Sequence, residues 1–274
     1  MGRLAFSTLG CPDWSFETIV EQAKNLGYCA IELRGVKDEL RIEKLPLFTS
    51  DNLQATKRLL DKNGLYICGA GTSVSFHDKS NVLQALEEGR AAIDTCCAAG
   101  IPAIRVFGDA IPPDEDKNAV FDRIASGFKE LCKYSEENAE GAVQIWMEVH
   151  GQFNKPETLS PIAERLSDCA LFGMIWDIQH THRAGVDPED FYREFKPLIR
   201  HTHFKDYRYE EDKLILTFPG EGILPIKVHY DVLENNGYTG LYSFEWEKRW
   251  ITDLPEPELS FPKYVELMNS FGCK

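Results

Sequence analysis

Residues 199–206 of the chain read Ile199-Arg200-His201-Thr202-His203-Phe204-Lys205-Asp206. The stretch has the length and setting of a buried strand, but it carries two imidazoles and an amine where apolar side chains are expected. Because side chains alternate along a strand, His201, His203 and Lys205 are predicted to share one face. Burying such groups without partners costs on the order of 2 kcal/mol or more for each group. The fold must therefore bring polar partners to this strand from elsewhere in the chain.

Seven other short apolar segments also have the character of strands, and segments with helical spacing separate them. The strands are expected at 4–8, 29–35, 65–70, 102–108, 143–149, 171–177 and 241–246, which makes 199–206 the seventh of eight. Helices are expected from Ser15 to Gly27, over 53–62, from Ser80 to Gly100, through 121–132, from about Ser160-Pro161, near 188–195 and through 264–271. This alternation predicts an α/β protein that forms a single (β/α)8 TIM barrel over residues 1–274.

An open, doubly wound sheet is the alternative fold for such a pattern. That fold usually has a glycine-rich phosphate-binding turn after the first strand, and Gly10-Cys11-Pro12 does not have this form. The barrel is therefore preferred. Residues 207–218 depart from the strand-helix pattern and predict a hairpin insertion after the seventh strand, where it would serve as a lid.

Composition and charge restrict the classes of partner. The chain of 274 residues is 43% hydrophobic and 27% charged, which is typical of a soluble globular protein. No apolar run approaches the ~20 residues of a membrane span, and residues 1–7 turn polar too soon for a signal peptide, so we expect a cytoplasmic protein without a membrane partner. The formal net charge of -14 argues against nucleic acid as a partner. A small molecule is favoured, and the oligomeric state, including a homo-oligomer, is left open.

The eight cysteines are scattered without the spacing of a disulfide framework, and no CxxC pair is present. Reduced thiols within the core are the preferred interpretation. A zinc site built from thiolates is disfavoured by the same spacing.

Four ionisable residues stand at the ends of successive predicted strands: Glu148, Asp177, His203 and Glu245. The carboxyl ends of barrel strands meet on one face, so these side chains are predicted to be neighbours. Three carboxylates and an imidazole repel one another unless a cation lies between them, and the donor set suits one divalent metal ion: Mn²⁺, Mg²⁺, Co²⁺ or Zn²⁺. The alternative is that each is a rim residue paired with Arg105, Arg183, Arg200 or Lys205. Four such residues in successive strands favour the metal site.

Several short motifs, in their order along the chain, resemble those of a known superfamily. They are Ile31-Glu32-Leu33-Arg34, Met147-Glu148-Val149-His150-Gly151, Trp176-Asp177-Ile178-Gln179-His180, His201 to Asp206, Pro219-Gly220-Glu221-Gly222 and Phe244-Glu245-Trp246. The chain resembles the xylose isomerase-like superfamily of sugar phosphate isomerases and epimerases, which includes inosose dehydratases and apurinic endonucleases. The resemblance implies the same four metal ligands. The endonucleases need further histidines, and Pro219-Gly220-Glu221-Gly222 stands where their additional ligands would be, so that activity is set aside.

The resemblance and the strand positions also suggest substrate contacts. We predict that the substrate is bound by His150, His180, Lys205 and Glu32, either directly or through support of the residues that contact it. His180 and His182 are expected on a loop after Asp177, and a solvated loop position is the alternative for His150. Lys205 is expected at the mouth of the barrel, where it would bind an oxyanion or hold Glu148, with a solvated lysine as the alternative. His201 is expected to lie deeper and to hydrogen-bond a buried carboxylate such as Glu32.

The predicted function is that of a metal-dependent sugar or sugar phosphate isomerase or epimerase. Glu148 and Glu245 would remove and return a carbon-bound proton through an enediolate. One alternative is a metal-dependent dehydratase of a keto-cyclitol or related polyol, similar to inosose dehydratase. The other is a non-catalytic, sugar-binding barrel. A carbohydrate is the expected small-molecule partner in each case.

Overall fold

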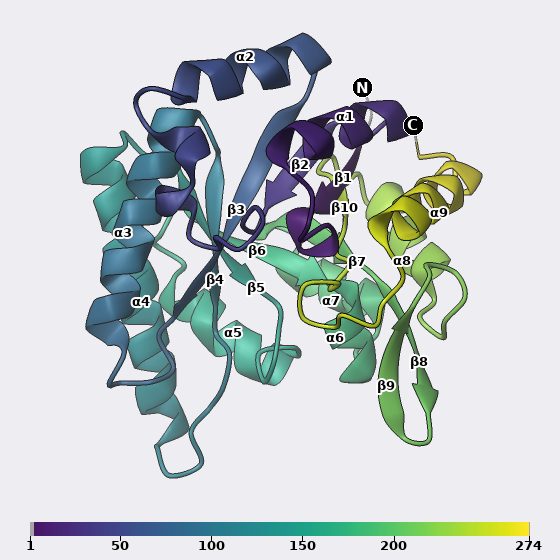
Figure 1. The fold of residues 1–274 in the computed structure, drawn as a ribbon. Coiled ribbons are helices and arrows are strands. Elements are labelled where there is room, and N and C mark those ends of the chain that lie inside the picture. Colours follow the sequence, from purple (N-terminus) through teal and green to yellow (C-terminus); the bar gives the residue numbers. More distant parts are fainter. Residues whose placement is uncertain (1–2, 274) are drawn as a thin grey trace.

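Eight parallel strands close into a barrel in the computed structural model, which describes residues 3–273 (Figure 1). The barrel strands are β1 Leu4–Ser7, β2 Ala30–Leu33, β3 Tyr66–Ser75, β4 Ala103–Phe107, β5 Gln144–Glu148, β6 Phe172–Asp177, β7 Ile199–Phe204 and β10 Tyr242–Phe244. They neighbour one another in the order β1-β10-β7-β6-β5-β4-β3-β2. The predicted (β/α)8 barrel is therefore confirmed.

Helices connect the strands and cover the outside of the barrel. They are α1 Phe16–Leu26, α2 Leu53–Asn63, α3 Val82–Ala99, α4 Lys117–Asn138, α5 Pro156–Arg165, α6 Ile178–Arg183, α7 Pro188–Phe195, α8 Ile226–Asn235 and α9 Pro257–Ser270. Short 3-10 turns at Thr8–Gly10, Ile42–Lys44 and Pro46–Phe48 complete the connections after β1 and β2. In Figure 1, α3 and α4 pack side by side on one flank of the barrel, opposite α8 and α9.

Helix α1 shows how local sequence sets these elements. Ser15 precedes the helix and its hydroxyl accepts a hydrogen bond from the Thr18 N–H, which satisfies one of the free donors of the first turn. Gly27 ends the helix in the left-handed region at a φ of 84°, a conformation that favours glycine. The apolar stripe between them, which includes Ile19 and Val20, is buried against the barrel.

Three helices differ from expectation, and one of them, α8, has no counterpart among the expected helices. Helix α5 begins at Pro156, so Pro161 lies inside the helix and not in its first turn. Both prolines suit a first turn, and the helix starts at the upstream one. Residues 178–183, expected as a loop, form α6 because the Asp177 side chain accepts hydrogen bonds from the N–H groups of Gln179 and His180 and so caps a helix. His180 and His182 therefore lie on a helix.

The hairpin after β7 consists of β8, Asp206–Glu210, and β9, Lys213–Thr217, which pair antiparallel and project from the barrel (Figure 1). Asp206 fixes its base. Its carboxylate accepts hydrogen bonds from the backbone N–H groups of Tyr207, Gly220, Gly222 and Leu224. A Cβ at residue 222 would lie 2.1 Å from Asp206 Oδ1, so this loop requires glycine there.

No helix within residues 3–273 is both long enough and apolar enough to cross a membrane.

Candidate metal centre

Four side chains converge at the carboxyl ends of neighbouring strands. Glu148 ends β5, Asp177 ends β6, His203 lies in β7 and Glu245 follows β10. Each offers one ligand atom, and these atoms all lie within 4.8 Å of one another. All four side chains are buried. The structure thus brings together the four residues that strand position had singled out.

The donor atoms of this cluster fit a divalent cation. His203 Nδ1 is buried without a hydrogen-bond partner, 3.4 Å from Glu148 Oε1 and 3.4 Å from Glu245 Oε1. Asp177 Oδ2 also lacks a hydrogen bond, although the Lys205 ammonium lies 2.8 Å away. Buried polar atoms without hydrogen bonds are uncommon, and a cation with oxygen and nitrogen ligands would bind both atoms. We therefore treat the four residues as a candidate metal centre.

Lys205 lies within the cluster and not at its mouth. Its side chain is only 1% exposed, and Nζ contacts Asp177, Glu245 and Glu247. The alternative of a solvated lysine is therefore wrong. Lys205 also does not hold Glu148, as one alternative had it, because Arg105 Nη1 donates to Glu148 Oε2 at 2.6 Å.

The electrostatic surroundings of the two glutamates differ. Burial would raise the pKa of Glu148, but Arg105 and His203 hold that pKa well below its usual range. Burial raises the pKa of Glu245 to about 7, although His203 and Lys205 oppose the shift. A pair of carboxyl groups with separated pKa values is typical of sites in which one group acts as a base and the other as an acid.

We expect metal affinity to rise with pH. Burial would lower the pKa of His203, but the charges of Glu245, Glu32 and Glu148 raise it well above its usual value. Without metal, a proton therefore occupies the imidazole, and a metal has to displace it. One displaced proton corresponds to about a tenfold gain in affinity per pH unit. Titration of Mn²⁺ against a competing chelator between about pH 6 and about pH 8 measures this slope, and a flat profile would contradict proton displacement.

Glu32 lies beneath the metal centre. One of its oxygens is 2.9 Å from His203 Nε2, and the other accepts from Ser243 Oγ at 2.8 Å and lies 3.0 Å from His201 Nε2. The predicted hydrogen bond between His201 and Glu32 is confirmed. Both Glu32 oxygens are occupied by the chain, so we assign Glu32 the support of His203 in place of the substrate contact expected from the sequence.

Glu32→Gln is expected to weaken metal binding by about 10- to 100-fold, because the carboxylate fixes the ring orientation of His203 and raises its basicity. The measurement is the dissociation constant for Mn²⁺. Ser243→Ala is the matched control, since it removes a different hydrogen bond of the same carboxylate and should change affinity less. Equal affinity in wild type and Glu32→Gln would show that this contact does not support the ligand.

A cavity of about 270 Å³ opens above the centre. Its lining includes Glu148, Glu245, His150 and Lys205. Arg105 also lines it and pairs with Glu148, an ion pair of the kind that the rim-residue alternative had proposed for it. Sequence reasoning missed the roles of Arg34 and Glu247, which line the cavity too. Arg34 stands in the Ile31-Glu32-Leu33-Arg34 motif and Arg105 interrupts the apolar run of β4, and these positions were the available signals.

His180 contacts His150, which lines this cavity. The two rings are 4.4 Å apart between centroids, and His180 Nε2 is 3.9 Å from Asp177 Oδ2. Burial lowers the pKa of His180 to about 4, so its ring is neutral near pH 7. A neutral ring can donate one hydrogen bond and accept another, which suits contact with a hydroxyl group.

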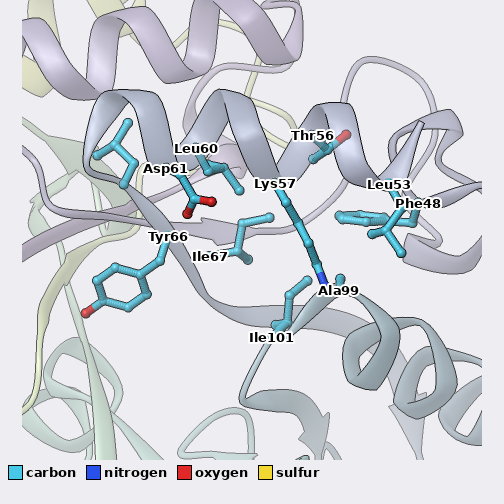
Figure 2. A pocket seen from close by; sticks show the side chains of 12 residues that line it. Phe48, Leu53, Thr56, Lys57, Leu60, Asp61, Tyr66, Ile67, Ala99 and Ile101 are labelled. Carbon is cyan, nitrogen blue, oxygen red and sulfur yellow. The ribbon is translucent and has the colours of Figure 1, made fainter. Parts of the chain in front are cut away.

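A second hollow of about 200 Å³ lies between α2, the start of β3 and the end of α3 (Figure 2). Lys57 reaches across it from α2 and donates to the Ala98 carbonyl at 2.7 Å. Its lining, which includes Leu60, Tyr66 and Ile101, shares no residue with the cavity above the metal centre. It lies at the amino ends of the strands, the face that usually serves stability in such barrels. We assign it no part in the chemistry.

Comparison with known proteins finds relatives of low sequence identity. An inosose dehydratase from Bacillus thuringiensis (strain Al Hakam) is 23% identical over 145 residues, which is 47% of this chain and 47% of that protein. The chain thus aligns with about half the length of the curated relatives it matches. Among solved structures, D-psicose 3-epimerase with D-tagatose from Clostridium cellulolyticum H10 has a TM-score of 0.76 at 15% identity, covering 99% of each chain. The IOLI protein with a bound zinc atom has a TM-score of 0.76 at 17% identity, covering 98% of this chain and 96% of that one.

These solved structures establish the fold, and the family follows from a separate comparison. The family model described as xylose isomerase-like TIM barrel matches residues 20–270, which is most of the chain. The chain therefore belongs to the xylose isomerase-like TIM barrel family.

Proposed function

We propose that the protein is a metal-dependent isomerase or epimerase of a small carbohydrate. The observation that carries the proposal is the pair of buried glutamates, Glu148 and Glu245, on either side of His203 and below an open cavity. The names of structural neighbours, among them an epimerase and a zinc-containing protein, support this choice.

The metal ligands in this proposal are Glu148, Asp177, His203 and Glu245. The bound cation would supply the positive charge that stabilises an enediolate as it forms. Arg105 keeps Glu148 ionised, so Glu148 is able to take a proton from the carbon next to a carbonyl group. Glu245, with its pKa at about 7, is able to return a proton to the other carbon or to the opposite face. Acid-base assistance of this kind typically contributes ~10²- to 10⁴-fold.

The cavity residues would hold the substrate in place. His150 lines the cavity, and the neutral ring of His180 contacts the His150 ring. Lys205 contacts Glu245 and Glu247 and so fixes the position of the proposed proton donor. We propose that His150 and His180 contact substrate hydroxyl groups while Lys205 orients Glu245.

A dehydratase of a keto-cyclitol or related polyol is the second candidate. The inosose dehydratases among the relatives favour it. The same first proton removal would be followed by loss of a hydroxyl group from the next carbon, with a donated proton leaving as part of water. Glu245 or His180 would donate that proton.

Incubation in D₂O with candidate ketoses and keto-cyclitols separates the two reactions. An isomerase or epimerase incorporates deuterium at carbon with no loss of water, whereas a dehydratase gives a product lighter by one water. If no candidate shows deuterium incorporation or loss of water, and the protein binds no divalent metal, both proposed reactions are contradicted. That result would favour a non-catalytic sugar-binding barrel.

A further inference from the structure

Two arginines lie side by side in the lining of the cavity. Arg34 follows β2 and Arg105 belongs to β4, on either side of Gly71 in β3. A Cβ at residue 71 would lie 2.6 Å from Arg34 Cδ and 2.9 Å from Arg105 Nη2, so both side chains cross this glycine. Arg34 is 6% exposed and Arg105 is 5% exposed. The chain thus buries two like charges side by side.

The charge of Arg34 has no direct counter-ion in residues 3–273. Its guanidinium donates to the Leu40 carbonyl at 3.2 Å and to Ser73 Oγ at 2.7 Å, both of which are neutral. Burial and the charge of Arg105 lower the pKa of Arg34 to about 10. Burying a cation beside a second cation is costly unless an anion joins them.

Arg105 is only partly satisfied. Nη1 pairs with Glu148, which is itself a proposed metal ligand. Nε is buried and has no hydrogen-bond partner among the described residues. The guanidinium lies 3.8 Å from the centre of the Phe107 ring, which fixes its plane. A planar guanidinium with free donors is suited to hydrogen-bond two oxygens of one anion.

We propose that the substrate carries an anionic group, a carboxylate or a phosphate monoester, that Arg34 and Arg105 bind beside the reacting carbons. This rests on the proposed function, because it places a substrate in the cavity above the metal centre. Both arginines line that cavity, whose volume of about 270 Å³ suits a small molecule. Because Arg105 also touches Glu148, the anionic group lies close to the carbon that loses its proton.

The alternative is that the arginines only hold Glu148 in place. Arg105 does so, but Arg34 makes its hydrogen bonds to a carbonyl and a serine and is not needed for that role. A neutral sugar would leave Arg34 buried without a paired anion, beside Arg105, which pairs with Glu148. The two interpretations differ in one measurable property. An anion site predicts that a charged substrate binds more tightly than a neutral one with the same carbon skeleton, whereas arginines that only hold Glu148 predict no such preference.

Three probes with one carbon skeleton test this preference: D-glycerate, glycerol 3-phosphate and glycerol. Their dissociation constants would be measured by calorimetry on the full chain loaded with Mn²⁺. We expect one of the anions to bind about 10- to 100-fold more tightly than glycerol. Preference for D-glycerate identifies a carboxylate, and preference for glycerol 3-phosphate identifies a phosphate. Equal binding of all three would overturn the proposal.

Arg34→Gln should abolish the preference, and Arg34→Lys should retain part of it because the charge remains while the planar donors are lost. Arg58→Gln, at an exposed position on α2, is the matched control and should change nothing. An undiminished preference in both Arg34 variants would overturn the proposal. Binding can be measured without turnover, so the two proposals can fail separately. Anion binding without deuterium exchange would refute the proposed reaction but support the anion site. Deuterium exchange without anion preference would support the reaction and refute the anion site.

Discussion

Glu148→Gln and Glu245→Gln are each expected to lower the rate of carbon-bound hydrogen exchange by ~10²- to 10⁴-fold. Glutamine keeps the shape of the side chain but cannot take or give a proton at neutral pH. The structural reason for expecting two strong effects is that the glutamates approach His203 Nδ1 at the same distance, 3.4 Å, and differ in pKa. The rate would be followed by NMR in D₂O on a substrate that the wild type turns over.

Both glutamates are also proposed metal ligands, so each variant would be assayed at saturating Mn²⁺ with its metal content measured. A rate loss that persists in the loaded protein assigns proton transfer to the side chain. Glu256→Gln is the matched control, because its side chain is 61% exposed and its one ion pair among residues 3–273 is with Lys248. Full activity in both Glu148→Gln and Glu245→Gln would refute the assignment.

His203→Ala is expected to abolish stoichiometric metal binding. The substitution removes the only nitrogen donor of the four-residue cluster and leaves Glu148, Glu245 and Glu32 without the imidazole between them. Breaking a buried charged pair typically costs about 3–5 kcal/mol, so the variant should also unfold more easily.

The thermal midpoint with and without Mn²⁺ measures both effects. Metal at about 100 times its dissociation constant stabilises a protein by about 2.7 kcal/mol, so wild type should show a clear rise and His203→Ala none. His77→Ala is the control, because His77 lies after β3 and contacts Ser75 and Asp109 outside the cluster. If Mn²⁺ raises the thermal midpoint of His203→Ala as much as that of wild type, the ion binds elsewhere.

The sequence predicted the four-residue cluster because the cluster depends only on which residues end the strands and on closure of the barrel. Alternation along β7 places His201 and His203 inside the barrel, and both reach Glu32 there. The barrel topology then makes strand ends neighbours, as in the pairing of Asp177 with His203. Regular strand spacing and closure of the barrel were thus enough to predict which side chains meet.

The sequence offered Arg105 and Lys205 as ion-pair partners but could not state which carboxylate each would contact. Arg105 meets Glu148 because β4 and β5 pair with Phe107 opposite Glu148, a register that the sequence does not state. Lys205 looked like a mouth residue, but three carboxylates draw its ammonium inward. Helix α6 was missed because its cap is Asp177, which had been considered only as a ligand. One side chain serves as strand end, helix cap and candidate ligand.

Anomalous X-ray diffraction from a crystal soaked in Mn²⁺ would locate the bound ion. We expect one strong peak at the position bounded by Glu148, Asp177, His203 and Glu245, with the Lys205 ammonium clear of it. No peak in that cluster, or a peak held by other residues while His203 Nδ1 remains without a ligand, would refute the proposed metal centre.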